Sequence, residues 1–448
     1  MTTTGTAEVL RPGDRGYDDA RQVWNAMFDR RPAMIVRCGS AQDVAAAVRS
    51  ARERGLEVSV RCGGHSAAGF GVTDGGMMID LTPMGRVSVD PVRRRAYVQG
   101  GALLGALDDA VQRYGLATTA GNVSHTGVGG LTLGGGMGWL ARQHGLACDN
   151  VLSYDLVTAD GEVLRVSDGD LFWGLKGGGG NFGIVTGFEF ALHDTGTSAL
   201  VVEAVFTGDA RHAAMRRWRD EHLTAPRQAT FTASSGPGTL TLGYVWTGPG
   251  SFSPAFVQGG AVTRQPMSYL RLQRRDDTSG RHALRRYGRS HYLKSMPDAA
   301  VDAFIAAGEH CGAGLQGYGG AIADVPQDAT AFGHRDTMFE FGAGTSWTDP
   351  AQDDDRRAVA RAAAALLEPF SGGVYVNSLG DEGAAGVRRA YPPAKLARLT
   401  ALKDRYDPDN VFHLNQNIKP SRDASRTGSC HTPQACAARS ASGAPQSR

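Results

Sequence analysis

Three glycine-rich segments constrain the fold of this chain more than any other feature. They span residues 61–66, 127–139 and 171–186. In the second, seven of thirteen residues are glycine, apolar residues separate them and serine is absent, which is not the composition of a flexible linker. Because glycine has no Cβ, such segments let the backbone turn tightly or lie against a ligand. They therefore predict backbone packed on a flat or anionic ligand, with purely structural turns as the alternative.

The first segment adds a reactive side chain to this pattern. Residues 61–66 read Arg-Cys-Gly-Gly-His-Ser and follow an alternating apolar stretch that predicts a strand. Successive amide groups in such a turn can form a concave anion site. His65 then places an imidazole at the edge of a nucleotide cradle, which indicates a covalently tethered flavin. A strand-end turn with a surface histidine is the alternative.

The composition describes a globular protein of two or three domains. The chain has 448 residues, 41% hydrophobic and 21% charged, with a net charge of +2. So small a charge does not favour nucleic acid or an anionic membrane as a partner. The N-terminus lacks the regions of a signal peptide, and no apolar run is long enough to span a bilayer. We therefore expect a cytoplasmic protein; the oligomeric state stays open.

The cysteines indicate neither a metal site nor a disulfide framework. No two of them form a C-x-x-C pair, so we expect them to be reduced and mostly structural. A pairing within the C-terminal tail stays open for the last two. The six are Cys38, Cys62, Cys148, Cys311, Cys430 and Cys436.

Apolar alternation and turn signals predict a β-α-β unit near the N-terminus. Strands are expected at 34–36 and 56–60, with a helix between them that opens at Ser40, three residues before Asp43. This order implies parallel strands. Asp160-Gly161 predicts a hairpin turn. Further strands are expected at 77–81, 87–90, 95–99, 154–157, 163–166, 188–192, 231–233 and 240–246, and helices at 102–114, 299–307 and 356–367.

Four blocks of sequence, taken in order, resemble a known family. Arg61–His65 reads R-x-G-G-H, and Val128–Gly138 reads V-G-G-x-x-x-G-G-G-x-G. Asp170–Thr186 runs from D-L-F-W through four glycines to N-F-G-I-V-T, and Tyr406–Ile418 looks like the family's closing motif. Over residues 20–420 the chain is similar to the FAD-linked oxidases of the vanillyl-alcohol-oxidase superfamily, in particular the berberine-bridge-enzyme-like branch.

The resemblance implies an α+β fold with a two-part FAD-binding domain and a substrate domain of antiparallel sheet covered by helices. On this basis residues 1–194 form the FAD-binding domain and 195–385 the substrate domain. Residues 386–420 return to the FAD domain. The last segment, 421–448, is rich in Ser, Ala, Arg, Gln and Pro and is expected to be disordered.

The resemblance also implies where the cofactor is held. In the family the histidine of R-x-G-G-H carries the flavin on its 8α-methyl group, which maps the tether to His65. Some relatives have a second tether, a cysteine, at the position of Val123, so a single covalent link is expected here. The cofactor-binding residues implied by the motifs are His65, Arg61, Cys62, Gly63, Gly64, Ser66, Gly69, Phe70, Gly121, Thr126, Gly129, Gly130, Thr132, Gly135, Gly136, Gly138, Asn181, Gly183, Val185, Asn415 and Asn417.

The general bases common in the family are largely missing. Ala67, Leu131 and Ser378 stand where relatives often carry a tyrosine, a histidine and an aromatic residue. A site without strong bases favours a substrate that gives up electrons easily, such as a hydroquinone. The catalytic residues stay unknown. Possible replacements are Tyr375, Asn377 and His125, each of which can equally be a packing or cofactor-supporting residue.

We therefore expect an oxidase that takes electrons from a small aromatic or quinone-type molecule and passes them to oxygen. Re-oxidation of a reduced mitomycin-like antibiotic, as self-resistance, is the specific form of this expectation. Thr126 lies where the family controls oxygen access. Oxidation of an alcohol, sugar or amine in secondary metabolism, a dehydrogenase with another acceptor, and a drug-binding protein that sequesters its ligand are the alternatives. The arginine-rich run 271–289 is expected to be a solvated face rather than an anion site.

Overall fold

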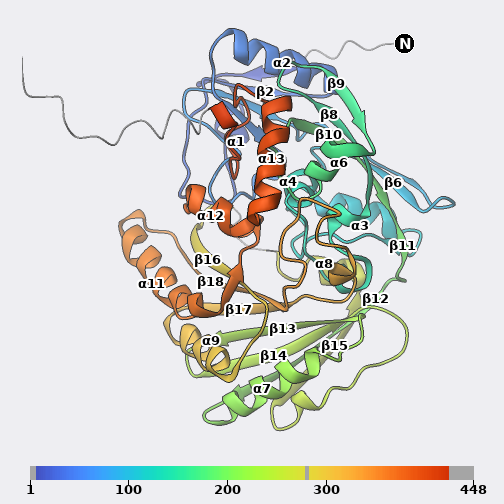
Figure 1. Cartoon of the computed structure of the whole chain (residues 1–448), viewed down its shortest axis with the longest axis vertical. Coiled ribbons are helices and arrows are strands. Elements are labelled where there is room, and N and C mark those ends of the chain that lie inside the picture. Colours follow the sequence, from blue (N-terminus) through green and yellow to red (C-terminus); the bar gives the residue numbers. More distant parts are fainter. Residues whose placement is uncertain (1–6, 278–281, 423–448) are drawn as a thin grey trace, which may run out of the picture.

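The computed structural model describes residues 7–277 and 282–422. Two smaller sheets and the C-terminal helices lie at one end of the molecule, and a large sheet lies at the other (Figure 1). This arrangement confirms the predicted mixed fold with an antiparallel-sheet domain. The tail from residue 423 onward, with Cys430 and Cys436, lies outside the described residues, and so does Arg281. The domain limits given above stay a prediction.

The N-terminal sheet contains the predicted β-α-β unit. β2 (Met34–Arg37) and β3 (Val58–Arg61) flank β4 (Met77–Asp80) in parallel, and β1 (Glu8–Leu10) pairs antiparallel with β2. The connecting helix is α2 (Ala41–Glu53), whose N-cap Ser40 accepts a hydrogen bond from the Asp43 amide at 3.2 Å. β3 begins two residues later than predicted because the Leu56 amide still bonds to the helix end at Ala51.

The second sheet is antiparallel, and its strands lie in the order β5-β6-β10-β8-β9. Gly161, with φ of 75°, lies in the predicted turn between β8 and β9. The strands are β5 (Val87–Asp90), β6 (Arg95–Gln99), β10 (Ile184–Ala191), β8 (Val151–Val157) and β9 (Val163–Val166). The helices of this part are α1 (Tyr17–Ala20), α3 (Leu104–Gln112), α4 (Val128–Leu133), α5 (Ala141–His144) and α6 (Gly169–Leu175). A short pair, β7 (Leu116–Ala117) with β11 (His193–Asp194), adjoins them.

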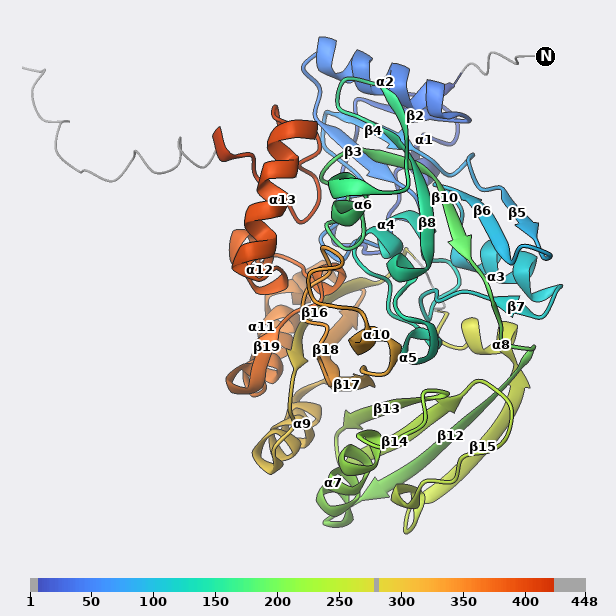
Figure 2. The ribbon, with the colours of Figure 1, turned by 45° about the vertical axis from the view of Figure 1, so that its right-hand side comes forward.

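The large sheet is antiparallel throughout, with its eight strands in the order β15-β12-β14-β13-β17-β18-β16-β19. Three helices cover one of its faces: α7 (Ala210–His222), α9 (Asp298–His310) and α11 (Asp353–Ala365) (Figure 2). The strands are β12 (Ser198–Thr207), β13 (Ala229–Gly236), β14 (Thr239–Trp246), β15 (Ala261–Ser268), β16 (Arg285–Leu293), β17 (Gly312–Gly317), β18 (Phe339–Trp347) and β19 (Ser371–Gly373). Two short helices, α8 (Tyr269–Gln273) and α10 (Ala321–Asp324), lie in its connections.

The chain then returns to the N-terminal part through α12 (Gly383–Ala390) and α13 (Pro393–Tyr406). At the end of α13, Lys403 and Asp407 form an ion pair at 2.6 Å in which both side chains are fully buried. Asp407 also accepts the amides of Val411 and Phe412. The pair therefore fixes the direction of the segment that follows α13. No helix of residues 7–277 and 282–422 is long and apolar enough to cross a membrane.

Candidate functional site

One cavity, of about 380 Å³, brings all three glycine-rich segments together with the C-terminal return. Its wall comes from residues 58–66, 126–133, 179–185 and 412–416, and from the segment around Asn377. Segments that are far apart in the sequence therefore meet at a single site. Of the residues predicted to bind the cofactor, those that line it are Cys62, Gly63, Gly64, His65, Ser66, Phe70, Thr126, Gly129, Gly130, Asn181, Gly183, Val185 and Asn415.

The remaining predicted residues lie outside the lining, and several of them pack loops together. A Cβ on Gly138 would lie 1.5 Å from the Ala120 carbonyl oxygen, and one on Gly69 would lie 2.2 Å from the Phe28 ring. These two glycines are therefore required by close packing. The residues outside the lining are Arg61, Gly69, Gly121, Thr132, Gly135, Gly136, Gly138 and Asn417.

The first two glycine segments interlock, backbone against backbone. A Cβ on Gly63 would lie 2.3 Å from the Gly127 amide nitrogen, and one on Gly127 would lie 2.4 Å from Cys62 Sγ. Any side chain at either position would force the loops apart. By contrast, a Cβ on Gly130 or Gly180 would meet nothing within 4 Å, so these two leave space open.

His65 is held on several sides. Its Nε2 lies 2.6 Å from His125 Nδ1, and its Nδ1 lies 3.4 Å from Thr126 Oγ1. Its ring stacks on Trp24, with centroids 5.0 Å apart. Burial, and then the charges that His125 and Arg286 can carry, lower the pKa of His65 to about 3. The imidazole is therefore neutral at physiological pH, which is the form that can act as a nucleophile.

The three candidate bases have different surroundings. The Tyr375 hydroxyl accepts the Gly136 amide and the Asn377 side chain, each at 2.8 Å, and burial raises its pKa. It thus supports the second glycine segment. Asn377 lines the cavity and also donates to the Leu131 carbonyl at 3.0 Å. His125 contacts His65.

The structure adds a carboxylate that was not among the predicted residues. Glu340, on β18, accepts hydrogen bonds from the Tyr318 hydroxyl at 2.7 Å and the Ser378 hydroxyl at 2.8 Å. Burial raises the pKa of Glu340. Ser378 stands in the sequence between two residues of the cavity wall, Asn377 and Leu379, so Glu340 is hydrogen-bonded to the segment that forms this wall. Its sequence signal is a single carboxylate between two buried phenylalanines of β18.

The face of the large sheet that is turned away from α9 and α11 carries an unusual number of glycines. Gly288 on β16 pairs with Gly344 on β18, which pairs with Gly312 on β17. In the next row Gly342 pairs with Gly314. Alternate residues, such as Phe341 and Ala343, pack toward the helices. We call Gly288, Gly312, Gly314, Gly342 and Gly344 the glycine face.

Backbone conformation does not require the glycine face, and crowding requires glycine only in part of it. A Cβ on Gly288 would lie 3.2 Å from the Ala343 oxygen and one on Gly344 3.3 Å from the Tyr287 oxygen, which is tight, whereas the other three positions have room for a Cβ. None of its five glycines has a positive φ. A Cβ on Gly342 would come no closer than 3.7 Å to Ser290 Oγ, and one on Gly314 no closer than 3.6 Å to the Ala233 oxygen. Both neighbours belong to the sheet itself, so nothing from the opposite part of the molecule fills the space. The result is an open, flat surface.

The arginine-rich run is not simply a solvated face. Arg274 pairs with Asp109 at 2.7 Å, and Arg285 and Arg289 pair with Asp353 and Glu382. Arg286 lies on the opposite side of its strand from Arg285 and is only 9% exposed. The expectation of a solvated face was therefore wrong for Arg286, because strand alternation turns every second residue inward.

Comparison with known proteins decides the family. A family model described as FAD binding domain matches residues 32–167, and one described as berberine and berberine like matches residues 374–419. The (R)-6-hydroxynicotine oxidase of Paenarthrobacter nicotinovorans is 30% identical, over 92% of this chain and 96% of the relative. The chain belongs to the berberine-bridge-enzyme-like FAD-linked oxidoreductases. Because it belongs to this family, the protein is an FAD-dependent oxidase.

Other members of the berberine-bridge-like family are similar over nearly the whole chain. The crystal structure of 6-hydroxy-D-nicotine oxidase from Arthrobacter nicotinovorans superimposes with a TM-score of 0.85 at 27% identity, covering 94% of this chain and all of that one. Glucooligosaccharide oxidase of Sarocladium strictum is 28% identical over 92% of each chain.

The cavity of this berberine-bridge-like oxidase fits FAD. Open glycine backbone at Gly130 and Gly180 lets a cofactor approach the main chain. Within the described part of the chain, the buried Asn415 Oδ1 has no hydrogen-bond partner, and Asn415 lines the cavity. An unpaired buried polar atom in a cavity wall is typical of a site that a ligand completes. The neutral His65 ring stands at the same cavity.

Proposed function

We propose that this enzyme carries FAD on His65 through a single covalent bond and oxidises a flat, fused-ring quinol, with oxygen as electron acceptor. The glycine face carries the substrate part of the proposal. Five strand positions without a Cβ leave a flat surface, and at Gly312, Gly314 and Gly342 a Cβ would meet no atom closer than 3.6 Å. Gly288 and Gly344 also line a smaller cavity of about 270 Å³. A planar polycyclic molecule is the ligand whose shape matches such a surface.

The contacts of His65 support the proposed tether. Nε2 lies 2.6 Å from His125, whereas Nδ1 has only the longer contact of 3.4 Å with Thr126 Oγ1, so Nδ1 is proposed to form the bond to the flavin. The position of a second tether is occupied by Val123, which has no nucleophile. The cavity-lining residues named above, with Arg61, Thr132 and Asn417 in support, are proposed to hold the rest of the cofactor.

Bound FAD supplies the hydride or single-electron acceptor of the reaction. The protein orients the substrate and receives its proton. Glu340, through the hydroxyl of Ser378, is proposed to accept the proton that a quinol loses on oxidation. Its elevated pKa makes it a stronger proton acceptor than an exposed glutamate. Tyr375 and Asn377 keep the second glycine segment in place.

We propose a reduced mitomycin-like antibiotic as the substrate, so that the enzyme acts in self-resistance in the cytoplasm, as a mitomycin radical oxidase does. The ease with which such a reduced quinone gives up electrons suits a site whose proposed proton acceptor is a single buried carboxylate. A second candidate is oxidation of an amine or a sugar, which the names of two relatives favour. A drug-binding protein that keeps flavin only as a structural element is the third.

A substrate panel separates the three. The purified enzyme is mixed under air with reduced quinones of one to three rings, (R)-6-hydroxynicotine and a glucooligosaccharide, and peroxide is measured. Peroxide formed only with fused-ring quinols supports the proposal. Turnover of the amine or sugar alone refutes the proposed substrate. Tight binding without turnover, equal in wild type and His65→Ala, supports sequestration instead.

A further inference from the structure

A short strap, residues 23–26, joins the loop of His65 to the large sheet. On the loop side, the Trp24 amide donates to the Gly64 carbonyl at 3.0 Å, and Asn25 Nδ2 donates to the Ala67 carbonyl at 3.1 Å. These bonds bracket the histidine. The strap therefore fixes the loop on both sides of His65.

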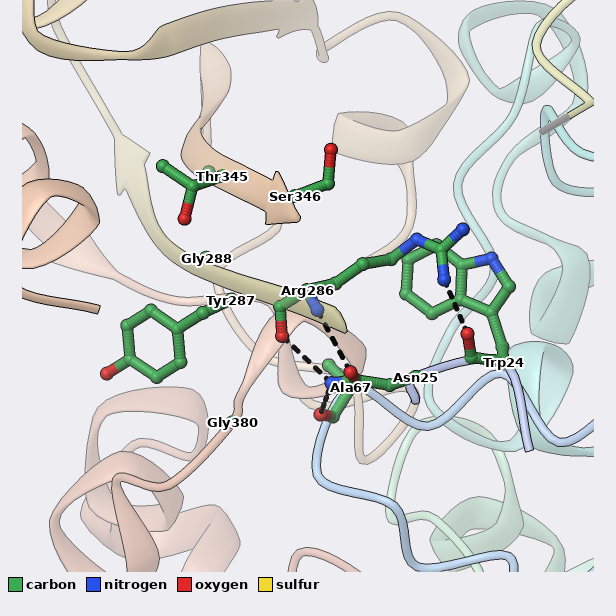
Figure 3. Close-up of a pocket in the computed structure, with 10 residues that line it drawn as sticks. Trp24, Asn25, Ala67, Arg286, Tyr287, Gly288, Thr345, Ser346 and Gly380 are labelled. Carbon is green, nitrogen blue, oxygen red and sulfur yellow. Dashed lines mark hydrogen bonds between the residues drawn. The ribbon is translucent and has the colours of Figure 1, made fainter. Parts of the chain in front are cut away.

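On the sheet side, the strap is bonded to the start of β16 and to Leu284, the residue before it. The Arg286 amide donates to Asn25 Oδ1 at 3.0 Å, and Asn25 Nδ2 donates to the Arg286 carbonyl at 2.9 Å (Figure 3). The Ala26 amide donates to the Leu284 carbonyl at 3.0 Å. Asn25 is only 2% exposed, so its bonds are protected from water.

Three side chains stack across the strap. The Arg286 guanidinium carbon lies 4.2 Å from the centre of the Trp24 ring (Figure 3). The Trp24 ring in turn stacks on His65 at 5.0 Å and 18°. A cavity of about 270 Å³, lined in part by Trp24, Arg286, Gly288 and Gly344, lies beside the stack. A buried cation thus stands behind the imidazole, where water screens it weakly.

We propose that Arg286, acting through Trp24, is a positioning residue that aligns the His65 ring with the flavin and raises the reduction potential of the flavin. The proposal rests on the cofactor assignment above but not on the substrate. A cation near the ring favours the extra negative charge that reduction brings. The indole acts as a rigid spacer between cation and imidazole, because Asn25 and Arg286 hold the strap to β16.

The field of Arg286 already acts on His65. The charge of Arg286 is among the causes that lower the pKa of His65, after burial and His125. The same field favours electrons on a ring bonded to His65. Arginine is suited to this position because its planar guanidinium stacks on an aromatic ring.

The test is the reduction potential of the flavin-loaded enzyme, measured without substrate against a reference dye. Arg286→Gln is expected to shift the ratio of reduced to oxidised flavin about tenfold toward the oxidised form at a fixed potential. Arg286→Lys, which keeps the charge, is expected to retain most of the wild-type ratio. Trp24→Leu is expected to broaden the flavin absorption and to lower the fraction of flavin attached, whereas Trp24→Phe keeps both.

Arg398→Gln is the matched control, since Arg398 lies 3.9 Å from the Trp173 ring and does not contact His65. It is expected to leave the potential unchanged. Equal potentials for wild type and Arg286→Gln would overturn the proposal, and so would an equal loss in Arg286→Lys. If Arg286→Gln does not fold, Trp24→Leu decides, because an unchanged flavin absorption and an unchanged fraction of attached flavin would overturn the proposal. If the wild type releases its flavin on denaturation, the covalent tether fails, while the potentials still test Arg286.

Discussion

Substitution of Gly342 by valine is expected to stabilise the fold and, at the same time, to lower kcat/KM for the substrate. Glycine inside a strand costs about 0.5–1 kcal/mol relative to alanine, because it loses more backbone freedom on folding. The nearest atom to a new Cβ at this position is Ser290 Oγ, at 3.7 Å, which is an ordinary contact. The unfolding free energy is therefore expected to rise by about 0.5–1 kcal/mol.

The three carbons of the valine side chain would occupy the surface on which the substrate is proposed to lie. One methylene in a binding pocket is worth about 1–3 kcal/mol, or roughly tenfold and more in kcat/KM. We expect kcat/KM for a fused-ring quinol to fall at least about tenfold. A single-ring hydroquinone, which leaves more of the surface free, is expected to lose much less. Steady-state oxygen consumption and chemical denaturation measure the two effects.

Gly39→Val is the matched control for this experiment. A Cβ on Gly39 also has its nearest neighbour at 3.7 Å, in Asp43, but Gly39 lies before α2 and far from the large sheet. It is expected to leave both substrates unaffected. If Gly342→Val loses stability, or slows both quinols equally, the glycine face is not the surface that holds the substrate.

Three further outcomes follow from single contacts. Lys403→Met leaves Asp407 buried without its cation and is expected to lower the free energy of unfolding by about 3–5 kcal/mol; denaturant unfolding measures this, and a loss below about 1 kcal/mol contradicts the role of the pair. Glu340→Gln is expected to lower kcat/KM by about 10²–10⁴. Because only the ionised carboxylate accepts a proton, the wild-type rate should rise with pH through the raised pKa of Glu340, and the variant should lack this rise. A variant with the pH profile of the wild type would show that Glu340 does not take part in the reaction. Since the pKa of His65 is about 3, flavin attachment to the apoprotein should be equally fast across about pH 5–8, whereas slowing below pH ~6.5 would indicate an ordinary histidine.

The features that the sequence predicts well are local ones, such as a helix cap, a hairpin turn and closely packed glycines. The capping serine at Ser40, the hairpin at Gly161 and the glycines of the first two segments depend on neighbouring residues or on a missing Cβ. Each therefore leaves a mark in a short stretch of sequence. The N-terminal β-α-β unit is confirmed for the same reason.

The sheet-borne features depend on pairings between distant strands. The glycine face exists only because Gly288, Gly344 and Gly312 fall in one row of three strands. A shift of one residue in any strand would turn its glycines to the helices. Arg286 points inward for the same reason, and Glu340 gains its partners from Tyr318 and Ser378, far away in the chain. No local pattern carries that information.

The covalent bond between FAD and His65 is the central claim, and one measurement tests it most directly. The purified enzyme is denatured, washed free of small molecules and digested, and the peptides are examined for flavin fluorescence and mass. The account predicts a yellow denatured chain whose only flavin-bearing peptide contains His65, and a His65→Ala variant that releases all of its flavin. A colourless denatured chain from a yellow native wild type, or flavin on another residue, would contradict it.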